Sequence, residues 1–307
     1  MTDLAPDDTI RPRSLRELTA AVRQVNRLAQ AARYEPMSKL LPDLLAELHT
    51  ATHTFAGQER DAAWGLLAEA SRCGHSVAIA IGLNELSVTA LQRMDWAASH
   101  AGDRAPALRA IREYLRVTAY LRARDFDACW RLNASGLAKL DDTDANTPDA
   151  LVARGQLHLG ASIIAAHTGD QDTMRDHLSE AERIATITGE RTERLWVGFG
   201  PTNVGVHRTM GLATAGEHGL AVEAAKGLRF PAEWLPSRIG HHHLDMARAW
   251  RWLAKPDRAL DALLTAKEVA PGQARRHPLA RDTVDALMRS ARRPSNALTD
   301  YAAWIGL

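Results

Sequence analysis

Apolar side chains recur at intervals of three and four positions along most of the chain, a spacing that predicts amphipathic α-helices. The clearest example is a pair of predicted helices within residues 240–271. Ala247 and Ala266 are small enough to let the two backbones approach closely, and Leu263 fills the seam between them. Pro256 suits the first turn of the second helix, where the missing N–H costs no hydrogen bond. This stretch therefore predicts a helix hairpin.

Weaker copies of this hairpin recur along the chain. Their predicted turns fall at residues 33–35, 82–84, 124–125, 169–170 and 216–217. The clearest copy has the spacing of a tetratricopeptide repeat, a helix hairpin of about 34 residues. No alternating apolar run is bounded by hairpin turns, so strands are not predicted. We therefore expect an all-α fold, a right-handed α-solenoid of degenerate tetratricopeptide-like helix hairpins.

The repeats predict one continuous domain over residues 13–293. A polar tail over residues 1–12 precedes it, and a C-terminal tail over residues 294–307 follows it. A last helix, near residues 280–292, is expected to cover the apolar end of the stack, which a solenoid otherwise exposes.

Composition narrows the class of protein. The 307 residues include 38 Lys and Arg against 37 Asp and Glu, a formal net charge of +1, which argues against a dedicated nucleic-acid binder. No apolar run approaches the roughly 20 residues that a membrane helix needs, and no secretory signal is visible. Two cysteines, Cys73 and Cys129, suit a reducing compartment. We expect a cytoplasmic protein that does not enter membranes.

Sequence motifs for catalysis are missing. The chain has no nucleophile elbow, no zinc-protease helix motif and no Walker loop. Consecutive His241, His242 and His243 point about 100° apart on a helix, so the three cannot all ligate one ion. Asp245 could join His241 at i+4, but we expect neither a metal nor another cofactor, and no enzymatic activity.

The segment from residue 196 to residue 208 concentrates polar and aromatic side chains. Gly, Phe, Gly and Pro at 198–201 break the preceding helix, and Thr202 is expected to cap the next one. Asn203 and His207 are four positions apart and share one helical face. Two interpretations stay open for these side chains: a hydrogen-bond network between repeats, or contact with a ligand.

The same segment carries a family resemblance. Residues 199–208 (FGPTNVGVHR), 238–250 (RIGHHHLDMARAW) and 276–279 (RHPL) resemble the regulatory part of actinobacterial transcription regulators. Those regulators join an N-terminal helix-turn-helix of the xenobiotic-response-element type to a C-terminal tetratricopeptide domain. The resemblance implies a cytoplasmic sensor that binds a signal, forms a homodimer and sets the posture of the DNA-binding heads. Only a dozen polar residues precede the first predicted helix, so we do not expect direct DNA binding by this chain.

These observations predict a non-enzymatic regulatory domain that binds a small molecule or peptide on the concave solenoid face and modulates transcription. Tryptophan supplies stacking area there, and arginine pairs with carboxylate or phosphate groups. The predicted ligand face comprises Trp196, Asn203, His207, Arg208, His242, Trp250 and Arg251. Two alternatives remain: a scaffold that binds a protein partner, and an enzyme that uses His207, His241 and Asp245 for acid–base chemistry.

Overall fold

The computed structural model describes residues 9–141, 144, 146–232 and 234–307. Residues 1–8 of the predicted polar tail lie outside this part. In the described residues the chain forms fifteen α-helices and two short 3-10 helices, and the sole strand-like feature is an antiparallel bridge between Arg191 and Phe199. The prediction of an all-α fold is therefore confirmed.

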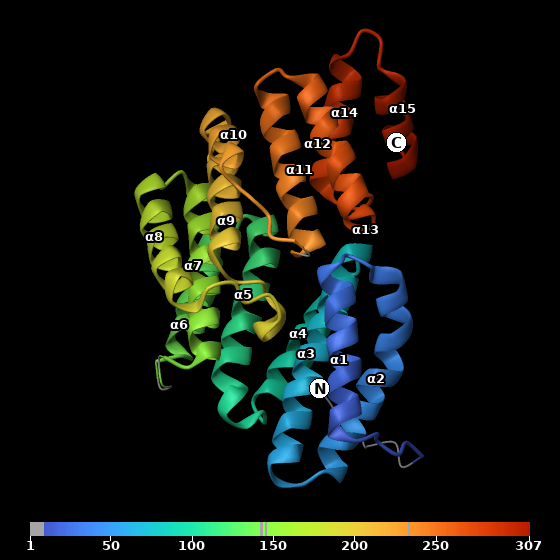
Figure 1. The fold of residues 1–307 in the computed structure, drawn as a ribbon, viewed down its shortest axis with the longest axis vertical. Coiled ribbons are helices and arrows are strands. Elements are labelled where there is room, and N and C mark those ends of the chain that lie inside the picture. The colour runs from blue at the N-terminus through green and yellow to red at the C-terminus, as the bar shows by residue number, and fades with distance from the viewer. Residues whose placement is uncertain (1–8, 142–143, 145, 233) are drawn as a thin grey trace. The chain divides into compact units, whose positions relative to one another are not determined.

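The chain divides into two compact units. The first contains the described residues up to 29, residues 33–157 and residues 193–197. Its elements are α1 (Leu15–Gln30), α2 (Tyr34–Thr54), α3 (Gly57–Ile81), α4 (Asn84–Ala98), η1 (Gly102–Arg104), α5 (Ala105–Ala123), α6 (Phe126–Ala138), the beginning of α7 (Pro148–Thr168), and η2 (Arg194–Trp196). From α2 to α6, each helix packs against the next one along the chain (Figure 1).

The second unit contains residues 30–32, 158–192 and 198–307. It comprises the rest of α7, α8 (Gln171–Thr188), α9 (Pro201–Thr214), α10 (His218–Lys226), α11 (Pro236–Trp252), α12 (Pro256–Val269), α13 (Pro271–Ala274), α14 (Pro278–Ser290) and α15 (Asn296–Ile305). Successive helices from α8 to α12 pack against one another, and α11 also contacts α9 and α14. The prediction of a single domain over residues 13–293 stays a prediction.

Most of the predicted turns separate helices. Residues 82–83, 124–125, 169–170 and 215–217 each connect two α-helices, whereas the first turn ends earlier than predicted because α2 already begins at Tyr34. Asp125 and Asp170 explain two of these starts, since each carboxylate accepts a hydrogen bond from a backbone N–H of the first helical turn, at 2.9 and 3.0 Å. Caps of this kind stabilise a helix by roughly 1 kcal/mol.

Small residues bring the helices of the second unit close together. Ala247, Leu263 and Ala266 are fully buried, as the hairpin prediction requires. At Gly240 the approach is so close that a Cβ would lie 2.6 Å from the Cβ of Ala270. A core rich in small side chains lets the helices pack densely against one another.

The predicted C-terminal tail contains a helix. The α15 side chains of Leu298, Tyr301 and Ile305 are buried in the same core as Val284 and Leu287 of α14. The aromatic and apolar residues near the C-terminus thus complete the core of the second unit.

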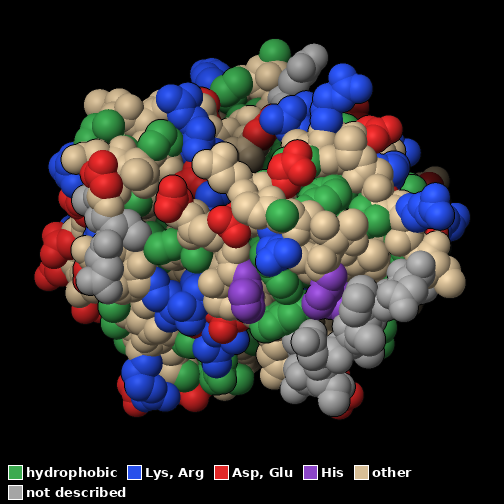
Figure 2. Space-filling view, turned by 90° about the horizontal axis from the view of Figure 1, so that it is seen from below, with side chains coloured by type: hydrophobic (Ala, Val, Ile, Leu, Met, Phe, Trp, Pro, Cys, Tyr) green, Lys and Arg blue, Asp and Glu red, His purple; other side chains and the backbone are tan. Residues whose placement is uncertain are grey.

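Two features of the described residues concern possible binding partners: the distribution of surface charge and the length of the apolar helices. Acidic and basic side chains are interspersed over the face drawn in Figure 2, which agrees with the balanced composition. In the described residues, no helix is both long enough and apolar enough to cross a membrane.

Candidate functional site

The connection between α8 and α9 sets the start of the helix that carries the candidate site. The expected cap at Thr202 is wrong: α9 begins one residue earlier, at Pro201, whose fixed φ suits the first helical position. Glu190 supplies the cap instead, because its Oε1 accepts a hydrogen bond from the N–H of Thr202 at 2.7 Å. Gly200 permits this contact, since a Cβ at that position would lie 2.8 Å from the Cα of Glu190.

Apart from Thr202 at the start of α9, five polar side chains lie buried on α9 and α11, two helices that contact each other. Asn203, His207 and Thr209 come from α9, and His242 and Asp245 come from α11. We call these five residues the α9–α11 polar layer. Within it, the Nδ1 of His207 lies 2.9 Å from the carbonyl oxygen of Asn203, and the Oγ1 of Thr209 lies 3.2 Å from the Nδ1 of His242.

Burial determines the charge states of the layer. It lowers the pKa of His207 to about 3, with Arg238 and His241 adding to the effect. It also lowers the pKa of His242 to about 4. Both imidazoles are therefore neutral near pH 7, and each offers one donor and one acceptor. For Asp245 burial acts in the opposite direction and raises the pKa to about 7, against the opposing charge of Arg248.

The polar layer approaches solvent at His241. This side chain is 31% exposed, and its Nε2 lies 3.6 Å from the Oδ2 of Asp245. The Oδ1 of Asp245 accepts from the Nη2 of Arg248 at 3.4 Å, whereas Oδ2 has no hydrogen-bond partner among the described residues. The ring of His277 meets that of His241 edge-on at 4.8 Å. The buried Oδ2 of Asp245 can thus accept a further hydrogen bond, and the half-buried side chain of His241 lies between it and solvent.

The remaining predicted residues of the second unit have partners of other kinds. Arg208 is exposed and pairs with Glu182 of α8 at 2.9 Å. Trp250 packs against the core of the unit. The guanidinium of Arg251 lies 4.3 Å from the ring centre of Trp252. Of the predicted ligand-face residues in the second unit, Asn203, His207 and His242 are buried.

Trp196 belongs to the first unit, where it forms a structural contact. Its indole N–H donates to the Oε2 of Glu69 at 3.0 Å, and Glu69 also accepts from Arg104 at 2.6 Å. Leu195 and Trp196 both adopt positive φ, at 50° and 56°, conformations that cost energy for residues other than glycine. The hydrogen bond and ion pair hold this strained turn in place.

Sequence reasoning missed Thr209 and the capping role of Glu190. Thr209 pairs with a histidine 33 positions away, and spacing along one helix cannot reveal that contact. For Asp245, the sequence does give a signal, because Asp245 follows His241 by four positions and such residues are neighbours on a helix. Nowhere in the described chain do three His, Cys, Asp or Glu side chains gather as ligands for a metal ion.

Comparison with known proteins gives no match: no family model, no curated protein and no solved structure corresponds to the chain.

Proposed function

We propose that this chain is a non-enzymatic, cytoplasmic regulatory domain that binds a small-molecule or peptide signal at the α9–α11 polar layer and modulates transcription. The observation that carries the proposal is the burial of five polar side chains on two helices that contact each other: Asn203, His207, Thr209, His242 and Asp245. Burying polar groups costs free energy unless hydrogen bonds compensate it, and an apolar seam would stabilise the fold more simply. A binding role accounts for this cost.

The chemistry of the layer suits a ligand that forms neutral hydrogen bonds. In both neutral imidazoles Nδ1 is the donor, to the carbonyl oxygen of Asn203 in His207 and to the hydroxyl of Thr209 in His242, so Nε2 is the acceptor. The Oδ2 of Asp245 can accept a further bond. The half-buried His241 at its edge offers a route of entry. A ligand with hydroxyl or amide groups would form hydrogen bonds with these atoms. A strongly charged ligand would bind less well, because moving a charge from water into this buried layer costs free energy.

The architecture supports the regulatory part of the proposal. Contacts between successive helices in each unit are those expected of a stack of tetratricopeptide-like hairpins. A ligand that prefers one arrangement of α9 against α11 would increase the population of that conformation. The surface presented to a partner, or to the second copy in a homodimer, would change as a result. The resemblance to actinobacterial regulators agrees with this mode of action.

One observation favours an enzyme as the second candidate. The carboxyl of Asp245, with a pKa of about 7, lies 3.6 Å from the imidazole of His241, and such a pair can move protons near neutral pH. An enzyme would convert the bound molecule, and Asp245→Asn would abolish that turnover. A sensor would bind the molecule and leave it unchanged.

The regulatory proposal is tested by comparing transcripts in host cells that carry the wild-type chain or a variant with His207→Leu and His242→Leu. Leucine keeps the layer buried but removes its hydrogen-bonding groups. We expect a defined set of transcripts to change at equal protein abundance. Arg183→Ala, at an exposed ion pair with Glu180 on α8, is the control and should change none of them. Identical transcripts in all three strains would contradict the proposal.

A further inference from the structure

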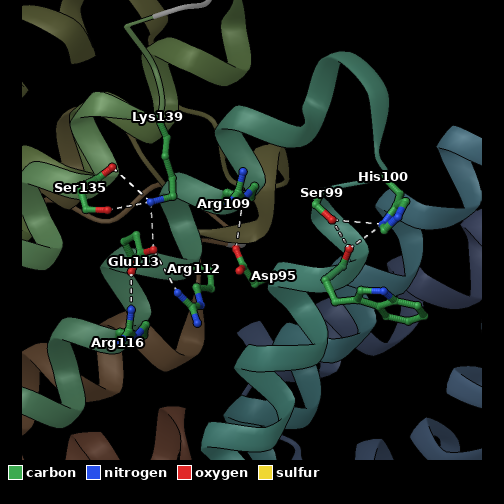
Figure 3. Close-up of polar contacts among 10 residues, drawn as sticks. Asp95, Ser99, His100, Arg109, Arg112, Glu113, Arg116, Ser135 and Lys139 are labelled. Carbon is green, nitrogen blue, oxygen red and sulfur yellow. Dashed lines mark hydrogen bonds and ion pairs between the residues drawn. The ribbon is translucent and has the colours of Figure 1, made fainter. Parts of the chain in front are cut away.

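A cluster of three cations surrounds one buried carboxylate in the first unit. Dashed lines join Glu113 of α5 to these cations (Figure 3). Its side chain is only 4% exposed. Its Oε1 accepts from Arg112 at 3.0 Å and lies 3.1 Å from the ammonium of Lys139. Its Oε2 accepts from Arg116 at 3.0 Å. We call these four residues the Glu113 cluster.

The Glu113 cluster carries more positive than negative charge. Burial alone would raise the pKa of Glu113, but Arg112, Lys139 and Arg116 together hold it below its ordinary value, so the carboxylate is ionised. Three cations around one carboxylate leave an excess of two positive charges. Among the described residues, no other carboxylate lies within ion-pair distance of these three cations. The cluster is therefore electrostatically incomplete.

The unused hydrogen-bond donors belong to the two arginines. Lys139 is occupied, since its ammonium also donates to the hydroxyl of Ser135 at 2.7 Å. Arg112 is 14% exposed and donates to Glu113 through Nη1. Arg116 is 33% exposed and uses only Nη1 on Glu113. By contrast, Arg109 on the same helix forms a pair with Asp95 at 3.2 Å.

We propose that Arg112 and Arg116 bind a phosphate group at the Glu113 cluster. The excess of two positive charges matches the charge of a phosphate dianion. Guanidinium groups bind phosphate oxygens in pairs through their planar fork of donors. Residues at i and i+4 are neighbours on a helix surface, which favours one compact anion over an extended acidic segment. The group can come from inorganic phosphate or from a phosphate monoester of a metabolite.

This site lies in the first unit and does not depend on the function proposed for the α9–α11 polar layer. Calorimetric titration of the whole chain with inorganic phosphate tests it, and a second titration uses glycerol phosphate as the monoester. Chloride keeps the ionic strength constant in both. We expect saturable binding at one site per chain. Tighter binding of glycerol phosphate would identify a metabolite as the source, and equal binding would identify phosphate itself.

Variants locate the site. Arg112→Gln and Arg116→Gln each relieve repulsion between like charges, so the fold should persist, and circular dichroism checks it. Each should weaken binding by roughly 10- to 100-fold, the effect of losing one charge-assisted hydrogen bond. Arg109→Gln is the matched control and should leave binding unchanged, whereas Glu113→Gln should strengthen it because a competing carboxylate is removed. Absence of saturable binding by folded wild-type chain, or equal binding by all variants, would overturn the proposal.

Discussion

Replacing Asp245 by asparagine should change how stability depends on pH. The carboxyl of Asp245 is 1% exposed, and its pKa is raised from 3.8 to about 7 in the folded chain. The folded state therefore holds a proton that the unfolded state releases at lower pH. Because the folded pKa is the higher one, this contribution to stability is fully present below about pH 4 and is lost as the pH rises through about 7.

The size of the effect follows from the shift. A pKa shift of about three units changes the free energy of unfolding by roughly 4 kcal/mol. Between the unfolded and the folded pKa, this free energy falls by about 1.4 kcal/mol for each pH unit. Asparagine resembles the protonated carboxyl in shape and cannot ionise. The free energy of unfolding of Asp245→Asn should therefore match that of the wild type near about pH 4 and exceed it increasingly up to about pH 7. His207 and His242 titrate with the opposite sign, since their lowered pKa values stabilise the fold above about pH 6.5. They are present in both chains and cancel in the difference.

Urea denaturation followed by circular dichroism measures this difference at several pH values between about 4 and 8. Asp285→Asn, at a carboxyl of α14 that is 45% exposed, controls for the loss of a surface charge. A difference between Asp245→Asn and the wild type that is the same at every pH would contradict a raised pKa of Asp245, and so would a variant that is the less stable chain at about pH 8.

Three further substitutions test the packing and one buried hydrogen bond. Gly240→Ala should lower the free energy of unfolding by about 1–3 kcal/mol, because its Cβ would lie 2.6 Å from that of Ala270, and a urea midpoint above that of the wild type would contradict this. Gly219→Ala on α10, where a Cβ meets nothing within 4 Å, should instead stabilise by roughly 0.4–1 kcal/mol in the same assay. Trp196→Phe removes the hydrogen bond to Glu69 and should cost about 1.5–3 kcal/mol, and an unchanged midpoint would show that this bond does not stabilise the turn.

Local chemistry explains why several of the helix boundaries could be predicted. Asp125 and Asp170 cap the helices that follow them, and Pro256 occupies the first position of α12. These signals act within a few residues of the boundary, so a sequence displays them directly. The shared face of Asn203 and His207 could be predicted for the same reason, because it depends only on helical spacing.

Contacts between distant segments could not be predicted in this way. Trp196 follows Leu195 into the left-handed region, and this turn directs its indole to Glu69, 127 positions earlier in the chain. Leucine and tryptophan rarely adopt a left-handed backbone conformation, so neither residue type predicts this turn. The bond between Thr209 and His242 depends on how α9 packs against α11. Periodicity predicts that a helix has a buried face, but it does not predict which polar groups meet there.

Native mass spectrometry of the chain, purified from its own host without refolding, tests most directly whether the α9–α11 polar layer binds a ligand. We predict an extra small mass on the wild-type chain that is lost on denaturation and is missing from the variant carrying His207→Leu and His242→Leu. Wild-type chain that shows only its own mass, or an extra mass that persists unchanged in the variant, would contradict the account.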